Sequence, residues 1–198
     1  MSSGVEKAWD ILRGLNPIDV SRDAGVSFKD TGYIIKSLGM DFFIDLSKGD
    51  ITALTKEAMT IINRYNYFLS HSVLWYLIGA KNVPLTGRLI KPQDLRGGHH
   101  FFTGTHELPL TGLASKFKED REGFLKRAIA LGGSPLSYGD ASTVLYPMPR
   151  IPITIILWTA CEEFPERADL LFDSSVQVHI SLDIIWSTAM LTVLSMLI

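Results

Sequence analysis

Three of the five histidines lie close together, at His99, His100 and His106, in a stretch rich in glycine and polar residues. Imidazole nitrogens are common metal ligands, and a single one can serve as an axial ligand to a haem or corrinoid. If residues 99–102 form a strand, His99 and His100 point to opposite faces and cannot both ligate one ion without a bend. Because the spacing also matches no standard zinc pattern, no metal site is predicted here.

A contact with a cofactor requires fewer residues than a metal site. One histidine is enough for axial ligation, and the residues before His106 would let it project from a loop. We therefore predict a cofactor-binding segment from Arg96 to Glu107. Its candidate residues are His106, His100, His99, Thr105 and Arg96. The alternative is that His106 bonds to a backbone carbonyl and only fixes the loop.

Carboxylates form a second candidate group. Glu162 and Glu163 directly follow an apolar run, at the end of a predicted strand where open sheets often place ligands. With Phe164 they are predicted to bind a partner. The alternative is a solvated turn in which the glutamates pair with Arg167.

Asp140 and Asp173 could join these glutamates if three predicted strands are neighbours. A carboxylate cluster without a visible base or nucleophile is weak evidence for catalysis, so no catalytic residue is assigned. The alternative to a binding protein is a small metal- or cofactor-dependent enzyme that uses Asp140, both glutamates and a loop histidine.

Composition excludes several functional classes. The net charge of −2 offers no basic stripe for phosphates, so nucleic-acid binding is not expected. The single cysteine, Cys161, excludes a disulfide within the chain and any site of four thiolates. The first ten residues contain no apolar run flanked by basic residues, as a secretory signal would require. A cytoplasmic location is expected.

The element that must position both groups is the apolar run Ile151–Trp158. It is rich in β-branched residues, follows Pro147 and Pro149, contains Pro152 as its second residue and is too short to span a bilayer. These features predict a strand buried on both faces in the middle of a sheet. Residues 138–146 and 168–173 are expected to form strands close to it in sequence, with 138–146 beside it.

Around this strand the pattern predicts one α+β domain over residues 1–198, with an irregular N-terminal segment to about residue 30. We expect a mostly antiparallel or mixed sheet of about five to seven strands. Three main helices, near residues 55–78, 115–131 and 182–198, would cover it. The last helix is so apolar that a core or partner helix is favoured, with a membrane-contacting tail as the alternative.

Several short motifs recur in a characteristic order. They are Gly97-Gly98, Phe102-x-Gly-x-His106, Leu131-Gly-Gly, Gly139-Asp-Ala, the three prolines between Pro147 and Pro152, Leu157-Trp158, Glu162-Glu-Phe-Pro and Phe172-Asp173. From about Thr31 to its end, the chain resembles an uncharacterised domain family of anaerobic bacteria and archaea. In some members this domain is fused to a four-cysteine iron–sulfur module of the type found in corrinoid/iron–sulfur proteins.

The resemblance implies a setting in anaerobic one-carbon metabolism, such as methanogenesis. There the protein would be a non-enzymatic accessory protein that docks on a corrinoid-dependent methyltransferase or a related complex, contacting its cobamide. The complex could be membrane-bound although this chain shows no transmembrane span. Because Cys161 is the only cysteine, the chain departs from members that carry the iron–sulfur module.

Overall fold

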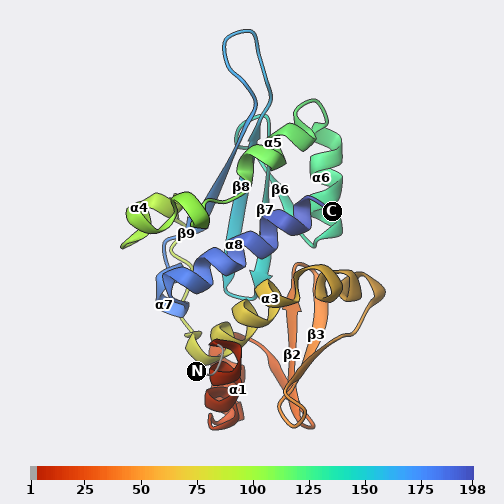
Figure 1. Ribbon diagram of the computed structural model, residues 1–198, viewed down its shortest axis with the longest axis vertical. Coiled ribbons are helices and arrows are strands. Elements are labelled where there is room, and N and C mark those ends of the chain that lie inside the picture. Colours follow the sequence, from red (N-terminus) through yellow and green to blue (C-terminus); the bar gives the residue numbers. More distant parts are fainter. Residues whose placement is uncertain (1–3) are drawn as a thin grey trace.

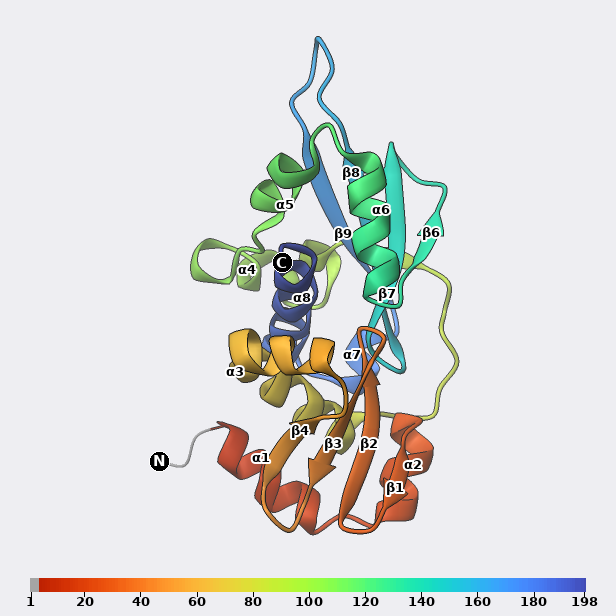
Figure 2. The ribbon, with the colours of Figure 1, turned by 90° about the vertical axis from the view of Figure 1, so that its right-hand side faces the viewer.

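Nine strands lie within residues 4–198, the part of the chain that the computed structural model describes. They form two antiparallel sheets (Figures 1 and 2). The first has the order β1-β2-β3-β4, with β1 (Ser27–Lys29), β2 (Gly32–Ser37), β3 (Met40–Asp45) and β4 (Asp50–Ala53). The second has the order β5-β9-β8-β7-β6, with β5 (Leu89–Ile90), β6 (Ser134–Leu136), β7 (Ala141–Met148), β8 (Ile151–Trp158) and β9 (Arg167–Asp173).

The α+β class with antiparallel strands is confirmed, but two sheets take the place of the one expected. The division occurs at α3 (Lys56–Gly79), a helix of 24 residues that follows β4. Its length carries the chain away from the first sheet before the next strand begins. α3 lies between the first sheet and the C-terminal helix α8 (Leu182–Met196), as Figure 2 shows.

The N-terminal segment is more regular than predicted. The spacing of apolar residues favours a short amphipathic helix at residues 5–12, which α1 (Gly4–Arg13) confirms, whereas α2 (Pro17–Ala24) and β1 were not predicted. α2 begins where the Asn16 side chain accepts a hydrogen bond from the amide of Ile18, and a proline occupies its first turn. Residues 1–3 of the same segment lie outside the described residues.

β8 occupies the position predicted for it. It is the middle strand of the second sheet, between β9 and β7, and its first seven residues are buried. The loop of residues 159–166 continues beyond the end of β8 before the chain returns as β9. In Figure 1 this loop forms the tip of the molecule at the top of the view.

Two helices replace the single one predicted near residues 115–131. They are α5 (Leu110–Phe117) and α6 (Arg121–Ala130). The break follows from Asp120, whose side chain accepts a hydrogen bond from the amide of Gly123 and so starts a new helix. Both helices, with α8, lie on one face of the second sheet (Figure 1).

α8 confirms the apolar C-terminal helix and lies in the core. Its hydroxyl side chains are also buried, and those of Ser187, Thr188 and Thr192 are hydrogen-bonded, whereas the Ser195 hydroxyl has no partner among the described residues. Ser187 bonds to Ser72 of α3 at 3.2 Å, and Thr188 donates to the carbonyl of Ile184 at 2.7 Å. Within residues 4–198 no helix is both long enough and apolar enough to cross a membrane.

The two sheets meet at a pair of glycine turns. The amide of Leu38 donates to the carbonyl of Tyr146 in β7 at 2.9 Å. Beside it, Gly39 and Gly132 are so close that a Cβ on Gly39 would lie 2.9 Å from the Cα of Gly132. Because both have positive φ angles, glycine is favoured at each position. Buried apolar residues from both sheets and from the helices form one continuous core.

The connections that remain carry short helices. η1 (Pro92–Asp94), α4 (Gly98–Phe101) and η2 (Gly104–His106) follow β5 and precede α5. α7 (Val176–His179) joins β9 to α8. These pieces place the histidine-rich segment on the side of the sheet that β5 and β9 border (Figure 1).

Candidate functional site

The histidine-rich segment is helical, so the conditional prediction of a strand at residues 99–102 was wrong. Gly97 adopts a φ of 81°, which breaks an extended chain, and the amide of Phe102 donates to the carbonyl of Gly98 at 3.0 Å. His99 and His100 are exposed, with their ring centroids 5.3 Å apart. One turn of helix, rather than an alternating strand, therefore sets the directions of these two side chains.

His106 packs within an aromatic group. Its ring stacks on Phe101 with centroids 4.4 Å apart and lies edge-on to Trp186 at 5.1 Å. This packing holds the imidazole half-buried against α8 instead of projecting it from a loop. Thr105 is exposed beside it.

Arg96 is fixed by its backbone. Its amide donates to the Gln177 side chain at 2.9 Å, and its carbonyl accepts from the same side chain at 3.0 Å. Arg96 itself is an exposed residue. The five residues predicted to contact a cofactor lie in one segment, where four are exposed and His106 is half-buried, and their role stays a prediction.

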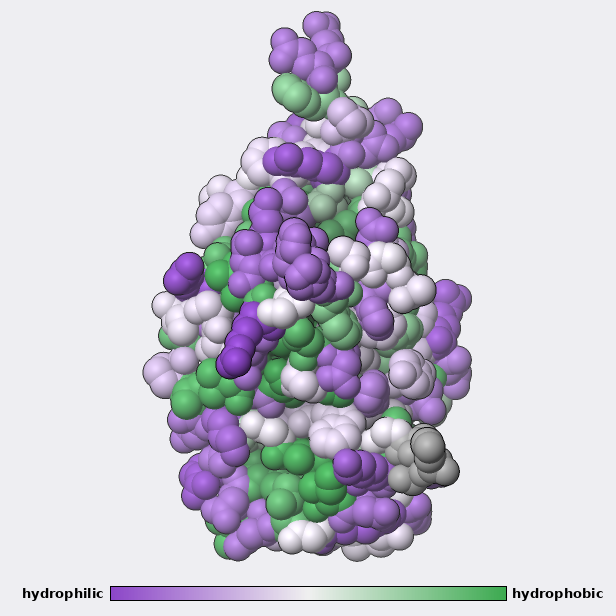
Figure 3. All heavy atoms as spheres, turned by 60° about the vertical axis from the view of Figure 1, so that its left-hand side comes forward, coloured by the Kyte–Doolittle hydropathy of each residue, from purple (hydrophilic) through white to green (hydrophobic). Residues whose placement is uncertain are grey.

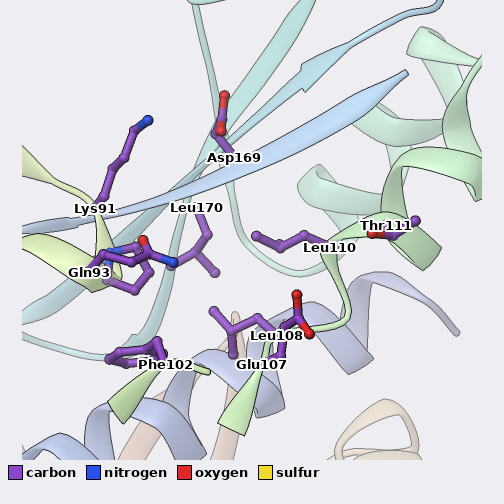
Figure 4. Close-up of a pocket in the computed structure, with 10 residues that line it drawn as sticks. Lys91, Gln93, Phe102, Glu107, Leu108, Leu110, Thr111, Asp169 and Leu170 are labelled. Carbon is purple, nitrogen blue, oxygen red and sulfur yellow. The ribbon is translucent and has the colours of Figure 1, made fainter. Parts of the chain in front are cut away.

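A pocket with a volume of about 470 Å³ lies on the inner side of this segment. Its lining joins four parts of the chain: the connection after β5, the connection before α5, the first turn of α5, and β9. Figure 4 shows Leu170 pointing toward Leu108 and Phe102, while Asp169 points to the other side of β9. Lys91 and Gln93 stand at one end of this pocket.

The predicted carboxylate cluster is only partly assembled. Asp173 lies at the far end of β9, where it pairs in register with Leu89, and it binds Thr86 and Ser175 rather than Asp140. The expected convergence of all four carboxylates is therefore wrong. The physical reason is register, because β9 runs antiparallel to β8 and carries Asp173 away from the loop where Glu162 lies.

Asp140 is held at the base of the loop that follows β8. Its Oδ2 accepts from the amide and the hydroxyl of Thr159, at 2.8 and 2.9 Å. Its Oδ1 lies 3.2 Å from the Nη2 of Arg121. The hydrogen bonds from Thr159, with a smaller contribution from the Arg121 charge, lower the pKa of Asp140 below its usual value. The carboxylate is therefore ionised and occupied at neutral pH.

A second pocket of about 790 Å³ lies beside Asp140. Trp158 lines it, with the guanidinium of Arg167 4.8 Å from the indole centroid. Arg121, Phe164 and Cys161 contribute to the same pocket. Arg121 and Trp158 had no predicted role in a site, because only the packing of α6 close to the end of β8 brings them to Asp140.

The loop beyond this pocket carries Glu162, Glu163 and Phe164. All three are exposed, and Phe164 retains 67% of its accessible surface, the most of any large aromatic side chain within residues 4–198. The amide of Cys161 donates to the carbonyl of Phe164 at 2.9 Å and closes the tip. Hydrophilic side chains dominate this projecting tip, with a small hydrophobic group below them (Figure 3).

The ion pair expected between these glutamates and Arg167 is not what holds the loop. Arg167 instead lies 3.7 Å from Asp169 and covers the Trp158 ring. Within residues 4–198 no group of three or more His, Cys, Asp or Glu side chains is arranged to hold a metal ion.

These features define an α+β protein with two antiparallel sheets and an acidic, aromatic-tipped loop. The family model described as "Domain of unknown function (DUF3786)" matches residues 16–195, and the chain belongs to this family. Neither the curated proteins nor the solved structures contain a match to this chain.

Proposed function

We propose that this protein is a non-enzymatic binding protein that docks on a partner through the loop of residues 159–166. The observation that carries the proposal is the exposure of Phe164, which belongs to the loop that forms the tip of the molecule (Figure 1) and has glutamates on both sides in sequence. Burying a phenylalanine side chain stabilises a complex by roughly 1.5–3 kcal/mol. Exposed aromatic side chains of this kind are typical anchors of protein interfaces.

The base of the loop supports this role. Thr159 is fixed by two hydrogen bonds to Asp140, and the tip is closed by the bond between Cys161 and Phe164. A loop held at both positions loses less conformational entropy on binding than a free one. Glu162 and Glu163 precede Phe164 in the sequence, and Glu166 follows it. The complementary partner surface is therefore an apolar pocket with a basic rim.

The state of Asp140 favours binding over acid–base catalysis. A general base needs a pKa near the working pH and a free oxygen directed at the substrate. Asp140 instead has a lowered pKa, and both of its oxygens are engaged by Thr159 and Arg121. We therefore do not propose the alternative enzyme that uses this carboxylate with Glu162 and Glu163.

For the partner we propose a corrinoid-dependent methyltransferase or a related complex of anaerobic one-carbon metabolism, the setting that the family resemblance implies. The cobamide would belong to that complex. His106 is half-buried between Phe101 and Trp186, which restricts the approach of a cofactor to its ring, so the geometry favours docking by the loop over axial ligation by His106.

Co-purification from native extract tests the proposal. We expect the wild-type protein to retain a methyltransferase complex and the variant Glu162→Lys/Glu163→Lys to lose it. The control carries the same charge change at two exposed acidic positions elsewhere, Glu119→Lys/Asp50→Lys. Equal retention by both double variants would contradict docking through this loop.

A spectroscopic measurement separates docking from direct cofactor contact. Cobalamin mixed with the isolated protein is examined between about 350 and 550 nm, for wild type and His106→Ala. We expect identical spectra, because the imidazole stays packed on Phe101. A band shift that only the wild type produces would establish His106 as a ligand.

A further inference from the structure

One edge of β9 is covered over only part of its length. β5 pairs with it at two positions, Leu89 with Asp173 and Ile90 with Phe172. The chain then turns away into η1 at Pro92. The rest of β9 toward Arg167 has no strand on this side among residues 4–198, because β9 pairs only with β5 and β8.

The backbone groups at this edge can be assigned from the register. The amide of Ser174 donates to the carbonyl of Arg88 at 2.9 Å, which continues the β5 pairing by one residue. Hydrogen-bonded pairs alternate along antiparallel strands, so every second residue from Ser174 directs its N–H and C=O to this side. These residues are Phe172, which β5 covers, and then Leu170 and Ala168, which it does not.

The pocket of about 470 Å³ lies where a continued β5 strand would run. Leu170, only 2% exposed, directs its side chain to the same side as Leu108 and Phe102 (Figure 4). Apolar side chains therefore line the face on which residues opposite Leu170 and Ala168 would project. Asp169 points to the opposite face. An incoming residue paired opposite Asp169 would direct its side chain to that same face.

We propose that this edge binds an extended segment of another protein, which adds to the sheet as an antiparallel strand in line with β5. The segment would exchange backbone hydrogen bonds with Leu170 and Ala168. Its residues at those two positions are apolar and face Leu108. The residue between them is lysine or arginine, because it stands directly opposite the carboxylate of Asp169. The recognised pattern is thus apolar–basic–apolar.

A second copy of this chain fits the edge poorly. Two β9 strands pairing about a twofold axis, with Leu170 opposite Ala168, would place Asp169 opposite Asp169 of the other copy. Like charges directly opposite one another destabilise a strand pair. The proposed segment places a cation there instead. This surface includes none of residues 159–166, so each proposal has its own test, although Asp169 also bonds to Trp158 at the base of that loop.

Backbone methylation of a synthetic peptide tests the proposal. The parent is a fluorescein-labelled heptapeptide with Val-Lys-Val at its centre, whose binding is measured by fluorescence anisotropy. A methyl group on the first valine nitrogen removes the bond to the Leu170 carbonyl and should weaken binding at least about tenfold. A methyl group on the lysine nitrogen, which points away from β9, should change affinity less than about threefold.

Protein variants test the groove and its charge. Thr111 is exposed at the pocket lining, so Thr111→Trp should block the peptide, whereas Thr52→Trp on the exposed face of β4 should not. Asp169→Asn should abolish the preference for Val-Lys-Val over Val-Gln-Val. Absence of peptide binding, or equal loss with either methylated peptide, would overturn the proposal. A dimer of the free protein that Thr111→Trp dissociates would also overturn it, in favour of a second copy.

Discussion

Trp158 donates its indole Nε1–H to the Oδ2 of Asp169 at 2.8 Å. The bond joins the last residue of β8 to β9 at the point where the loop of residues 159–166 begins. It fixes the indole plane on which the Arg167 guanidinium rests. The same aspartate stands at the open edge of β9, so one side chain connects the base of the projecting loop with the edge groove.

Removing this acceptor should loosen the loop base. Asp169→Ala leaves the half-buried indole N–H without its protein partner and should lower the free energy of unfolding by about 1 kcal/mol. Asp169→Asn retains an oxygen acceptor and should lower it by less. Urea denaturation followed by tryptophan fluorescence measures both, and equal losses in the two variants would show that the hydrogen bond contributes nothing.

The contact between the two sheets depends on glycine at two positions. Gly132→Ala introduces a Cβ 2.7 Å from the Cα of Gly39, in addition to the strain of a positive φ angle. We expect a loss of about 2–3 kcal/mol in unfolding free energy. Gly87→Ala is the matched control, since its φ of 71° carries the same strain but no atom lies within 4 Å of the new Cβ. That control should lose only about 1 kcal/mol. Equal losses would mean that the close approach is unimportant.

Asp173 should make the fold sensitive to acid. Burial raises its pKa, but hydrogen bonds from Ser175 and Thr86 outweigh that effect and lower the pKa to about 2. Because the folded-state pKa lies below the unfolded value, the stabilisation is complete above about pH 4 and is lost as the pH falls toward 2. The contribution is about 2 kcal/mol.

Denaturation curves measured between pH 5 and pH 2 test this. Asp173→Asn should be less stable at pH 5 and should show a shallower loss of stability toward pH 2 than the wild type. Asp45, whose pKa is also about 2, chiefly through the Ser47 hydroxyl, maintains part of the slope in the variant. An unchanged slope would exclude Asp173 as a source of acid sensitivity.

His179 should add a second pH dependence nearer neutrality. Its residue is only 3% exposed, and burial, followed by the Arg150 charge, lowers the pKa of the imidazole. The neutral ring accepts a hydrogen bond from the Lys81 amide at its Nδ1, at 3.2 Å. Since the unfolded state takes up the proton first, stability should decline as the pH falls below about 6.5.

His179→Asn keeps an acceptor for the Lys81 amide but cannot take up the proton. The difference in urea midpoint between pH 7.5 and pH 5.5 should therefore be smaller in this variant than in the wild type. His71, whose pKa is also lowered by burial, is unchanged in the comparison and serves as an internal reference. A larger difference in the variant would contradict the assignment.

Local sequence patterns predicted much of the fold. The β-branched run of β8, the Thr55 cap of α3 and the apolar period of α8 each specify their element without help from distant residues. The division into two sheets could not be predicted, because it depends on which strands pair. The pattern predicted one continuous helix through Asp120, although aspartate also favours the start of a helix, as it does here.

The candidate site was less accessible to prediction for a geometric reason. Neighbours in sequence, such as Glu162 and Phe164, were correctly placed together on an exposed loop. Asp140 meets Thr159 and Arg121 only through strand register and helix packing, which one sequence does not specify. The open edge of β9 likewise arises because β5 ends after two residues, and no local motif predicts that length.

The most direct test of the central claim is the affinity of the purified methyltransferase complex for the protein and for Phe164→Ser. The control is Ile129→Ser on α6, an apolar side chain that is 57% exposed on another surface. We predict that the loss of the aromatic anchor weakens binding by at least about tenfold, whereas the control leaves it unchanged. Equal affinities of wild type and Phe164→Ser would contradict docking through this loop.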